Sequence, residues 1–185
     1  MSKQILIDAD GRMKKAVEVV RDELARIRTG KATTALLDGV KVDYYGTMTP
    51  LKQVANISTP DAHTISVQAW EKSMLGPIEK AIQNANLGLN PVNDGNVLRV
   101  PIPPLNEERR RDLVKLVKKF AEDGKIAVRN VRRDAIEHLK KAEKNEHLSE
   151  DDRKREEQEA QKMTDRHIKE IDGLVAQKEK EIMEV

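Results

Sequence analysis

The sequence predicts an α+β protein: a long antiparallel three-helix bundle with a small inserted α/β domain of the β/α/β type. Apolar residues recur at helical spacing in three segments, and strand-like alternation and prolines are concentrated between the first and the second. Of the 185 residues, 36% are charged and 2% are aromatic, a composition that favours aliphatic seams between helices over a sandwich or a barrel.

Each of the three helical segments carries one narrow apolar stripe. The first stripe comprises Met13, Ala16, Val17, Val20, Leu24 and Ile27. The second comprises Leu113, Leu116, Val117, Phe120, Val128, Val131, Ala135, Leu139 and Ala142. The third comprises Ala160, Met163, Ile171, Leu174, Val175 and Ile182. Three such stripes can be buried against one another in an elongated bundle.

Helix-start signals place the second and third helices. Asn106 is a good N-cap and is followed by two glutamates, which the helix dipole favours in a first turn. Ser149, with Asp152 three residues on, resembles a capping box. As one helix, residues 107–144 would span roughly 55 Å. Gly124 lies inside this helix and should cost about 1 kcal/mol relative to alanine, which predicts a local weakness rather than a break.

The residue pattern between the first two helices predicts a small α+β domain. Strands are predicted at VKVDYYG (40–46), HTISVQAW (63–70) and VLRVPI (97–102), and a short helix at 73–88. We expect Tyr44, Tyr45 and Trp70 to pack this domain, although neighbouring strand residues point to opposite faces, so that one tyrosine could serve a partner.

The predicted bundle domain comprises residues 1–29 and 106–185, and the inserted domain residues 31–104. The two connections, near 28–31 and 101–105, are short and adjacent; one contains a glycine and the other three prolines. Such a pair of linkers predicts a hinge with limited rotation. A rigid insertion with ordinary turn residues is the alternative.

Charge is distributed unevenly between the second and third helices. Residues 106–145 contain 13 basic and 8 acidic side chains, and residues 146–185 contain 8 and 13. Three arginines, Arg129, Arg132 and Arg133, fall within five positions. At about 100° per residue, a basic stripe lies within about 40° of Arg129, opposite the apolar face. Its further members are Arg111, Lys115, Lys118, Lys125, Arg133 and Lys140.

Two interpretations of this basic stripe remain open. It could be a solvated helix face, partly paired with the acidic third helix. Alternatively, a long cationic face containing arginines suits a phosphate backbone, because guanidinium binds phosphate in a bidentate manner. The scarcity of aromatic residues argues against stacking on single-stranded bases, so an RNA contact would recognise shape and phosphate.

The sequence contains no recognisable catalytic motif. Cysteine is absent, which excludes thiol nucleophiles and zinc–thiolate sites. The histidines His63, His138, His147 and His167 share no ligand spacing and are interpreted as surface residues. The segment at 29–31 ends like a P-loop but lacks the earlier glycine. We therefore expect no enzyme activity, no cofactor and no metal.

No stretch is apolar enough for a signal sequence or a membrane span. A cytoplasmic, monomeric protein without membrane contact is expected.

Three stretches together resemble bacterial ribosome recycling factors. They are RTGKATTALLDGVKVDYYGTMTPLKQVANI (28–57), LGLNPVNDGNVLRVPIPPLNEERRRDLVK (87–115) and VRNVRRDA (128–135). The resemblance covers essentially the full length and implies an L-shaped protein with a long bundle and a hinged second domain. It further implies binding to the post-termination ribosome, across the A and P sites against large-subunit ribosomal RNA. Elongation factor G, hydrolysing GTP, would then act with the factor to drive the subunits apart and release mRNA and tRNA.

The resemblance also assigns roles to individual residues. Arg129 and Arg132 match the RNA-contacting arginines of the family, and Arg110 matches a basic position near the start of the long helix. With Arg133 and Lys125 of the basic stripe, these residues form the predicted rRNA-binding set. The hinge residues implied are Arg28, Thr29, Gly30, Pro101, Pro103, Pro104 and Leu105. Lys31, where the family usually has arginine, and Gly124, where it usually has a helix former, depart from the pattern.

Two other functions are compatible with parts of the sequence. A coiled-coil-like adaptor that binds only protein would self-associate and show no preference for RNA. A hydrolase would need paired carboxylates in the inserted domain, but Asp38, Asp43, Asp61 and Asp94 show no such pairing by spacing.

Overall fold

The computed structural model describes residues 2–145 and 148–184. The chain forms two compact units. One contains residues 2–28, 107–145 and 148–184, and the other contains residues 29–106. The predicted α+β class, with long helices and a small domain of antiparallel strands, is confirmed.

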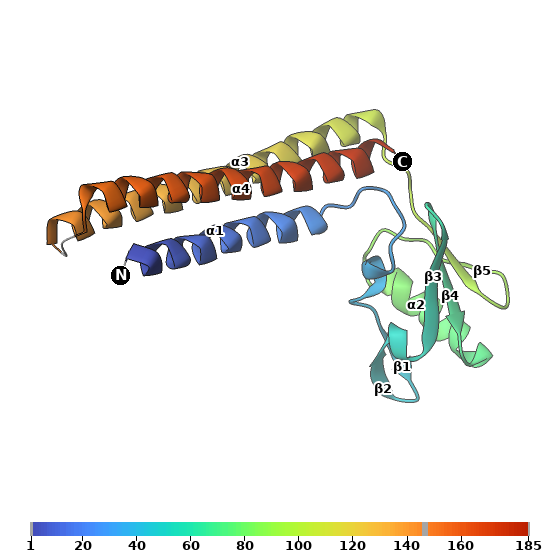
Figure 1. The fold of residues 1–185 in the computed structure, drawn as a ribbon. Helices are drawn as coiled ribbons and strands as arrows, with labels where there is room; N and C mark the ends of the chain where they lie inside the picture. The colour runs from blue at the N-terminus through green and yellow to red at the C-terminus, as the bar shows by residue number, and fades with distance from the viewer. Residues whose placement is uncertain (1, 146–147, 185) are drawn as a thin grey trace. The chain divides into compact units, whose positions relative to one another are not determined.

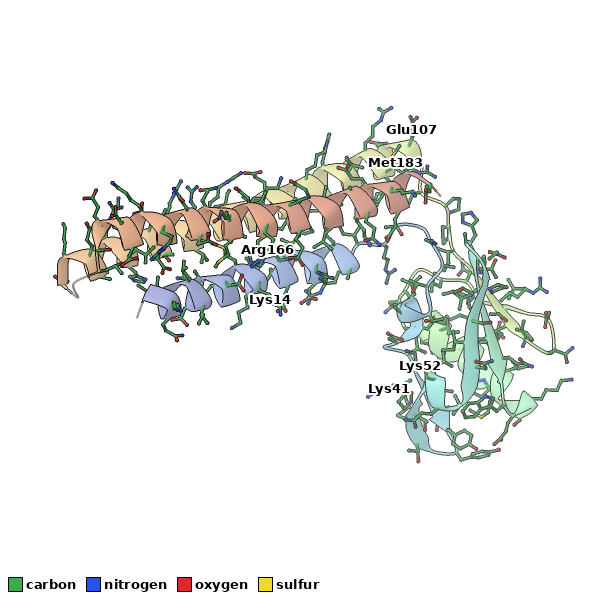
Figure 2. All side chains as sticks on the ribbon, viewed as in Figure 1. Lys14, Lys41, Lys52, Glu107, Arg166 and Met183 are labelled. Carbon is green, nitrogen blue, oxygen red and sulfur yellow. The ribbon has the colours of Figure 1, made fainter. Side chains whose placement is uncertain are left out.

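The first unit is a bundle of three long helices that lie side by side, α1 (Ser2–Ala25), α3 (Glu107–Asn145) and α4 (Glu150–Met183) (Figure 1). Helix α3 runs antiparallel to the other two, so that Glu107 at its start and Met183 at the end of α4 lie at the same end of the bundle (Figure 2). Helix α4 begins as predicted, with the Ser149 hydroxyl accepting a hydrogen bond from the backbone N–H of Asp152. Helix α3 begins immediately after Asn106.

Most of the predicted apolar stripe residues are buried along the bundle axis. Leu116 is an exception, because 36% of its surface is exposed. Two polar residues of α4, Thr164 and His167, occupy the seam instead and are 1% and 5% exposed. The prediction that His167 is a surface residue is therefore wrong.

The glycine inside α3 lies where side chains of the other two helices pack closely against its backbone. Helix α3 continues through Gly124, as predicted, and this residue is buried. A Cβ placed there would lie 2.2 Å from Cγ2 of Val20 on α1 and 3.4 Å from Cδ1 of Ile171 on α4. Gly124 therefore creates the space into which Val20 packs, and its cost in helix propensity accompanies a gain in packing.

The inserted unit contains two antiparallel sheets and one α-helix. Strands β1 (Lys41–Tyr44) and β2 (Thr47–Pro50) form a hairpin. The second sheet has the order β3-β4-β6-β5, with β3 at Ala55–Asp61, β4 at Thr64–Ala69, β5 at Val92–Asn93 and β6 at Leu98–Pro101. Helix α2 (Leu75–Asn84) lies between β4 and β5 in the chain. Strands β2, β3 and β5 were not predicted; β3 is an edge strand that contains Pro60 and has mostly exposed residues.

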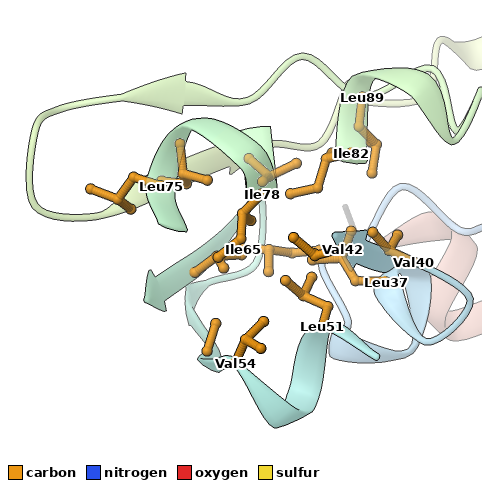
Figure 3. Packing of buried hydrophobic residues seen from close by; sticks show 14 of the residues in the cluster. Leu37, Val40, Val42, Leu51, Val54, Ile65, Leu75, Ile78, Ile82 and Leu89 are labelled. Atoms are coloured by element: carbon orange, nitrogen blue, oxygen red, sulfur yellow. The ribbon is translucent and has the colours of Figure 1, made fainter. Parts of the chain in front are cut away.

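The core of this unit is aliphatic. Leu75, Ile78 and Ile82 of α2 pack with Val42 of β1 and Ile65 of β4 (Figure 3). Three 3₁₀ turns, at Thr34–Leu37, Leu51–Gln53 and Lys72–Met74, contribute further side chains to the same core.

The aromatic residues of the inserted unit lie largely outside its core. Trp70 is 68% exposed and Tyr45 is 74% exposed, which contradicts the prediction that they pack the domain. Tyr44 packs partly against the core. The two tyrosine hydroxyls donate to separate oxygens of the Glu71 carboxylate, at 2.6 and 2.9 Å.

Candidate nucleic-acid interface

One side of α3 is basic and faces away from the other two helices. We define the outer basic face as Arg111, Lys115, Lys118, Arg129, Arg133 and Lys140. All of these are exposed except Arg129, which is half-buried. Within the described residues, the side chains of Lys115, Lys118, Arg133 and Lys140 have no ion-pair or hydrogen-bond partner. Four cationic groups on this face are thus available to an external anion.

Arg129 is held loosely. Its Nη1 lies 3.2 Å from Oε1 of Glu122, on the same helix, and both side chains are substantially exposed. Exposed pairs of this kind contribute about 0–1 kcal/mol. A phosphate could therefore replace Glu122 as the partner of this guanidinium at little cost.

Three other residues of the predicted set turn towards α4 instead of outward. Nζ of Lys125 lies 2.5 Å from Oδ1 of Asp172, and only 22% of the Lys125 side chain is exposed. Arg132 donates from Nη1 to Oε1 of Gln161 at 2.6 Å.

Arg110, the third, donates from Nη1 to the carbonyl of Met183 at 3.3 Å, in the last turn of α4. A cation there complements the negative end of the helix dipole. The predicted set is therefore divided between an outward group, Arg129 and Arg133, and a seam group, Lys125, Arg132 and Arg110.

Sequence analysis missed a polar cluster between α1 and α4. Nε2 of His167 lies 2.8 Å from Oδ1 of Asp10, and Nη2 of Arg166 donates to the same oxygen at 2.6 Å. The hydrogen bond with His167 and the positive charge of Arg166 hold the pKa of Asp10 below its usual range. A signal was available, because Ala160, Thr164, His167 and Ile171 follow an alternating four- and three-residue spacing that defines one helix face.

The other histidines form no comparable polar cluster within the described residues. His63 and His138 are exposed, and His147 lies outside the described residues. In the described part of the chain, no three histidine or acidic side chains are arranged to hold a metal ion. No helix among residues 2–145 and 148–184 is long and apolar enough to cross a membrane.

The two predicted hinge segments touch each other inside the inserted unit. Gly30 has a φ of +74°, and a Cβ there would lie 3.0 Å from Cγ of Leu105. Thr29 is buried, whereas Arg28, Pro103 and Pro104 are exposed. Pro101 belongs to β6, and the next residue, Ile102, donates its N–H to the carbonyl of His63 at 2.7 Å.

A three-helix bundle with an inserted α+β unit and a cationic helix face defines a class of binding proteins. Comparison with known proteins identifies the family. The family model described as ribosome recycling factor matches residues 20–183. The chain belongs to the ribosome recycling factor family, whose members are non-enzymatic translation factors.

Individual relatives match along almost their whole length. The chain is 54% identical to the ribosome-recycling factor of Nitratidesulfovibrio vulgaris (strain DP4), over 98% of this chain and 97% of that protein. It is 55% identical to the factor of Symbiobacterium thermophilum over the full length of both. With the factor of Cupriavidus metallidurans, it is 58% identical over 94% of each.

Solved structures agree in fold. A solution structure of a ribosome recycling factor aligns with a TM-score of 0.75 and 47% identity, covering 100% of this chain and 98% of that one. A T. thermophilus ribosome recycling factor, in a structure with E. coli elongation factor G bound to the E. coli post-termination complex, aligns with a TM-score of 0.64. It is 48% identical over 99% of both chains.

Proposed function

We propose that this protein binds the post-termination ribosome at the A- and P-site region of the large subunit. Together with elongation factor G, which hydrolyses GTP, it dissociates the ribosome into subunits and so releases mRNA and tRNA for new initiation. Membership of the family supports this proposal. So does the similar T. thermophilus protein, which is found with elongation factor G on a post-termination complex.

The single observation that carries the RNA contact is the outer basic face. Its free cations lie on one side of a 39-residue helix. From Arg111 to Lys140, helix α3 therefore presents charge along a length of about 45 Å, at about 1.5 Å per residue. Such a row suits the sugar–phosphate backbone of ribosomal RNA. Arg133 and Arg129 are the proposed outward contacts, and Arg132, Lys125 and Arg110 contribute from the seam with α4.

The two linkers supply the proposed hinge. Residues 28–31 and 103–105 lie outside any helix or strand, whereas Pro101 is paired within β6 and Ile102 donates its N–H to the carbonyl of His63. We place the pivot at Gly30 and Leu105, where the two linkers meet. Force applied to the inserted unit by elongation factor G would then reach the rRNA-bound bundle, whose packed helices bend little.

Subunit splitting tests the proposal directly. Post-termination ribosomes, this protein, elongation factor G and GTP are mixed, and light scattering is followed. We expect a fall in scattering that requires all components and is lost when Arg129 and Arg132 are both replaced by alanine. Each direct charged hydrogen bond contributes roughly 1.5–3 kcal/mol, so the double variant should lose several kcal/mol of ribosome affinity.

Lys14 provides the matched control. It is an exposed lysine on α1, outside the outer basic face of α3 (Figure 2), and its side chain has no partner within the described residues. Lys14→Ala removes one positive charge from the same bundle and should leave splitting nearly unchanged. Tight ribosome binding without any fall in scattering would contradict the recycling function. Self-association with no dependence on RNA would favour a protein-only adaptor.

A further inference from the structure

Arg132 is held in place by a neutral side chain. Its Nη1 donates to Oε1 of Gln161 on α4 at 2.6 Å, and its Nε is buried without a hydrogen-bond partner. Gln161 is itself fixed, because its Nε2 donates to Oδ1 of Asp165, one turn further along α4, at 2.8 Å. The chain of contacts Arg132–Gln161–Asp165 therefore orients both ends of the glutamine amide.

The neutrality of this acceptor distinguishes Arg132 from Lys125 and Arg129. Lys125 is paired with the carboxylate of Asp172, and Arg129 with that of Glu122. A carboxylate restrains a cation but also compensates its charge, whereas an amide oxygen restrains it and leaves the charge in place. Arg132 is thus restrained without being neutralised, which is the state that a phosphate-binding guanidinium requires.

We infer that Gln161, oriented by Asp165, is a positioning residue that holds the Arg132 guanidinium ready for a phosphate of ribosomal RNA. This inference rests on the proposed function and adds α4 to the RNA-binding site. Nη1 is engaged by Gln161 and Nε is buried, so the N–H groups of Nη2 are the ones that serve the phosphate. Fixing the side chain before binding reduces the rotamer entropy that is lost when the contact forms.

Two substitutions separate charge from positioning. Gln161→Glu places a carboxylate where the amide oxygen lies, so that an ion pair competes with the phosphate. We expect an approximately tenfold loss of ribosome affinity. The slope of log affinity against log salt should also become shallower, by the amount that the loss of about one phosphate contact gives. Gln161→Ala removes the restraint but leaves the charge, so we expect a loss of about threefold with an unchanged salt slope.

Gln158 provides the matched control. It is exposed, lies about one turn before Gln161, and has no side-chain partner in the described part of the chain. Gln158→Glu adds the same negative charge at a residue that makes no hydrogen bond with Arg132, so its effect on affinity measures general repulsion from RNA.

A double-variant cycle on 70S ribosomes, titrated at several salt concentrations, completes the test. With Arg132→Ala as the background, Gln161→Ala should have no effect and Gln161→Glu should cost no more than Gln158→Glu. Equal losses in both backgrounds, or Gln161 variants that bind like the unmodified protein, would overturn the positioning role while leaving recycling intact. Failure of the unmodified protein to bind ribosomes would instead refute the proposed function, and the inference with it.

Discussion

The bundle and the inserted unit are stabilised by different means. In the inserted unit, aliphatic side chains from two sheets, three 3₁₀ turns and α2 converge on one core. In the bundle, a narrow aliphatic seam is flanked by polar contacts between helices, such as Arg12–Asp134, Arg21–Glu170 and Lys125–Asp172.

This difference has a consequence for function. Charged residues in the bundle both join helices and form the surface that we assign to RNA, so that a single substitution can affect both roles. In the inserted unit, the exposed aromatic residues lie apart from the core, so that surface and stability can be changed separately. The following predictions test this contrast, beginning with the largest expected effect.

Truncation of the inserted core should have the largest effect. Ile78 is fully buried, so Ile78→Ala should destabilise the inserted unit by about 2–5 kcal/mol through lost burial and a cavity. Hydrogen exchange should show faster opening of residues 29–106 and unchanged protection of the bundle. Ile126→Ala, at a site 47% exposed on α3, is the control and should cost far less. Equal loosening of both units would show that their stabilities are not separate.

Glycine replacements within the bundle should differ in sign. Gly124→Ala should destabilise the bundle by about 1–2 kcal/mol, because Val20 is β-branched and has little freedom to move away from the new methyl group. In α4, Gly173 has no heavy atom within 4 Å of its Cβ position, so Gly173→Ala should stabilise by up to about 1 kcal/mol. Thermal unfolding of both variants measures the difference. A stabilising Gly124→Ala would show that the close helix approach is not required.

The polar contact between α1 and α4 should make bundle stability depend on pH. His167 and Arg166 favour the ionised form of Asp10 and lower its pKa in the folded state. The resulting stability is present above the unfolded pKa, about 3.9 for aspartate, and is lost as pH falls through the lower folded value.

Asp10→Asn should accordingly reduce stability at pH 7 by about 1 kcal/mol, since the partly exposed contact is screened. The variant should also lose less stability than the unmodified protein between pH 5 and pH 2, in unfolding titrations with urea. Parallel pH profiles for the two proteins would exclude a role for this carboxylate.

The smallest expected effect on stability concerns Trp70, an exposed aromatic residue of the inserted unit. Trp70→Ala should change the free energy of unfolding by no more than about 0.5 kcal/mol, because the side chain is 68% exposed. In denaturant titrations, the unfolding midpoint of the variant should equal that of the unmodified protein within experimental error. A loss above 1 kcal/mol would show that Trp70 packs the domain, as the sequence first suggested.

The sequence predicted the features that depend on local chemistry. Helical periodicity located all three long helices, and the Ser149–Asp152 pair located the start of α4. The predicted strands at β1, β4 and β6 are confirmed, because their buried residues alternate along the chain. Family membership followed from long motifs that carry far more information than composition.

The features that were missed depend on partners distant in the sequence. Strand β3 is formed by pairing with β4, since its own residues, including Asn56, Ser58 and Pro60, have low strand propensity. His167 is buried in the seam, where its Nε2 lies 2.8 Å from Oδ1 of Asp10, a residue 157 positions away in the sequence. Likewise, periodicity placed the basic residues of α3 on one side but could not show that Gln161 and Asp172 of α4 would engage two of them.

The most direct test of the central claim is the salt dependence of ribosome binding. Equilibrium binding of the unmodified protein to 70S ribosomes would be compared with that of the Arg129→Ala/Arg133→Ala double variant, after circular dichroism has shown that both are folded. We predict weaker binding and a slope of log affinity against log salt that is shallower by about 1.4–1.8, as two phosphate contacts would give. An unchanged affinity and slope in the folded variant would contradict the claim that the outer basic face of α3 holds ribosomal RNA.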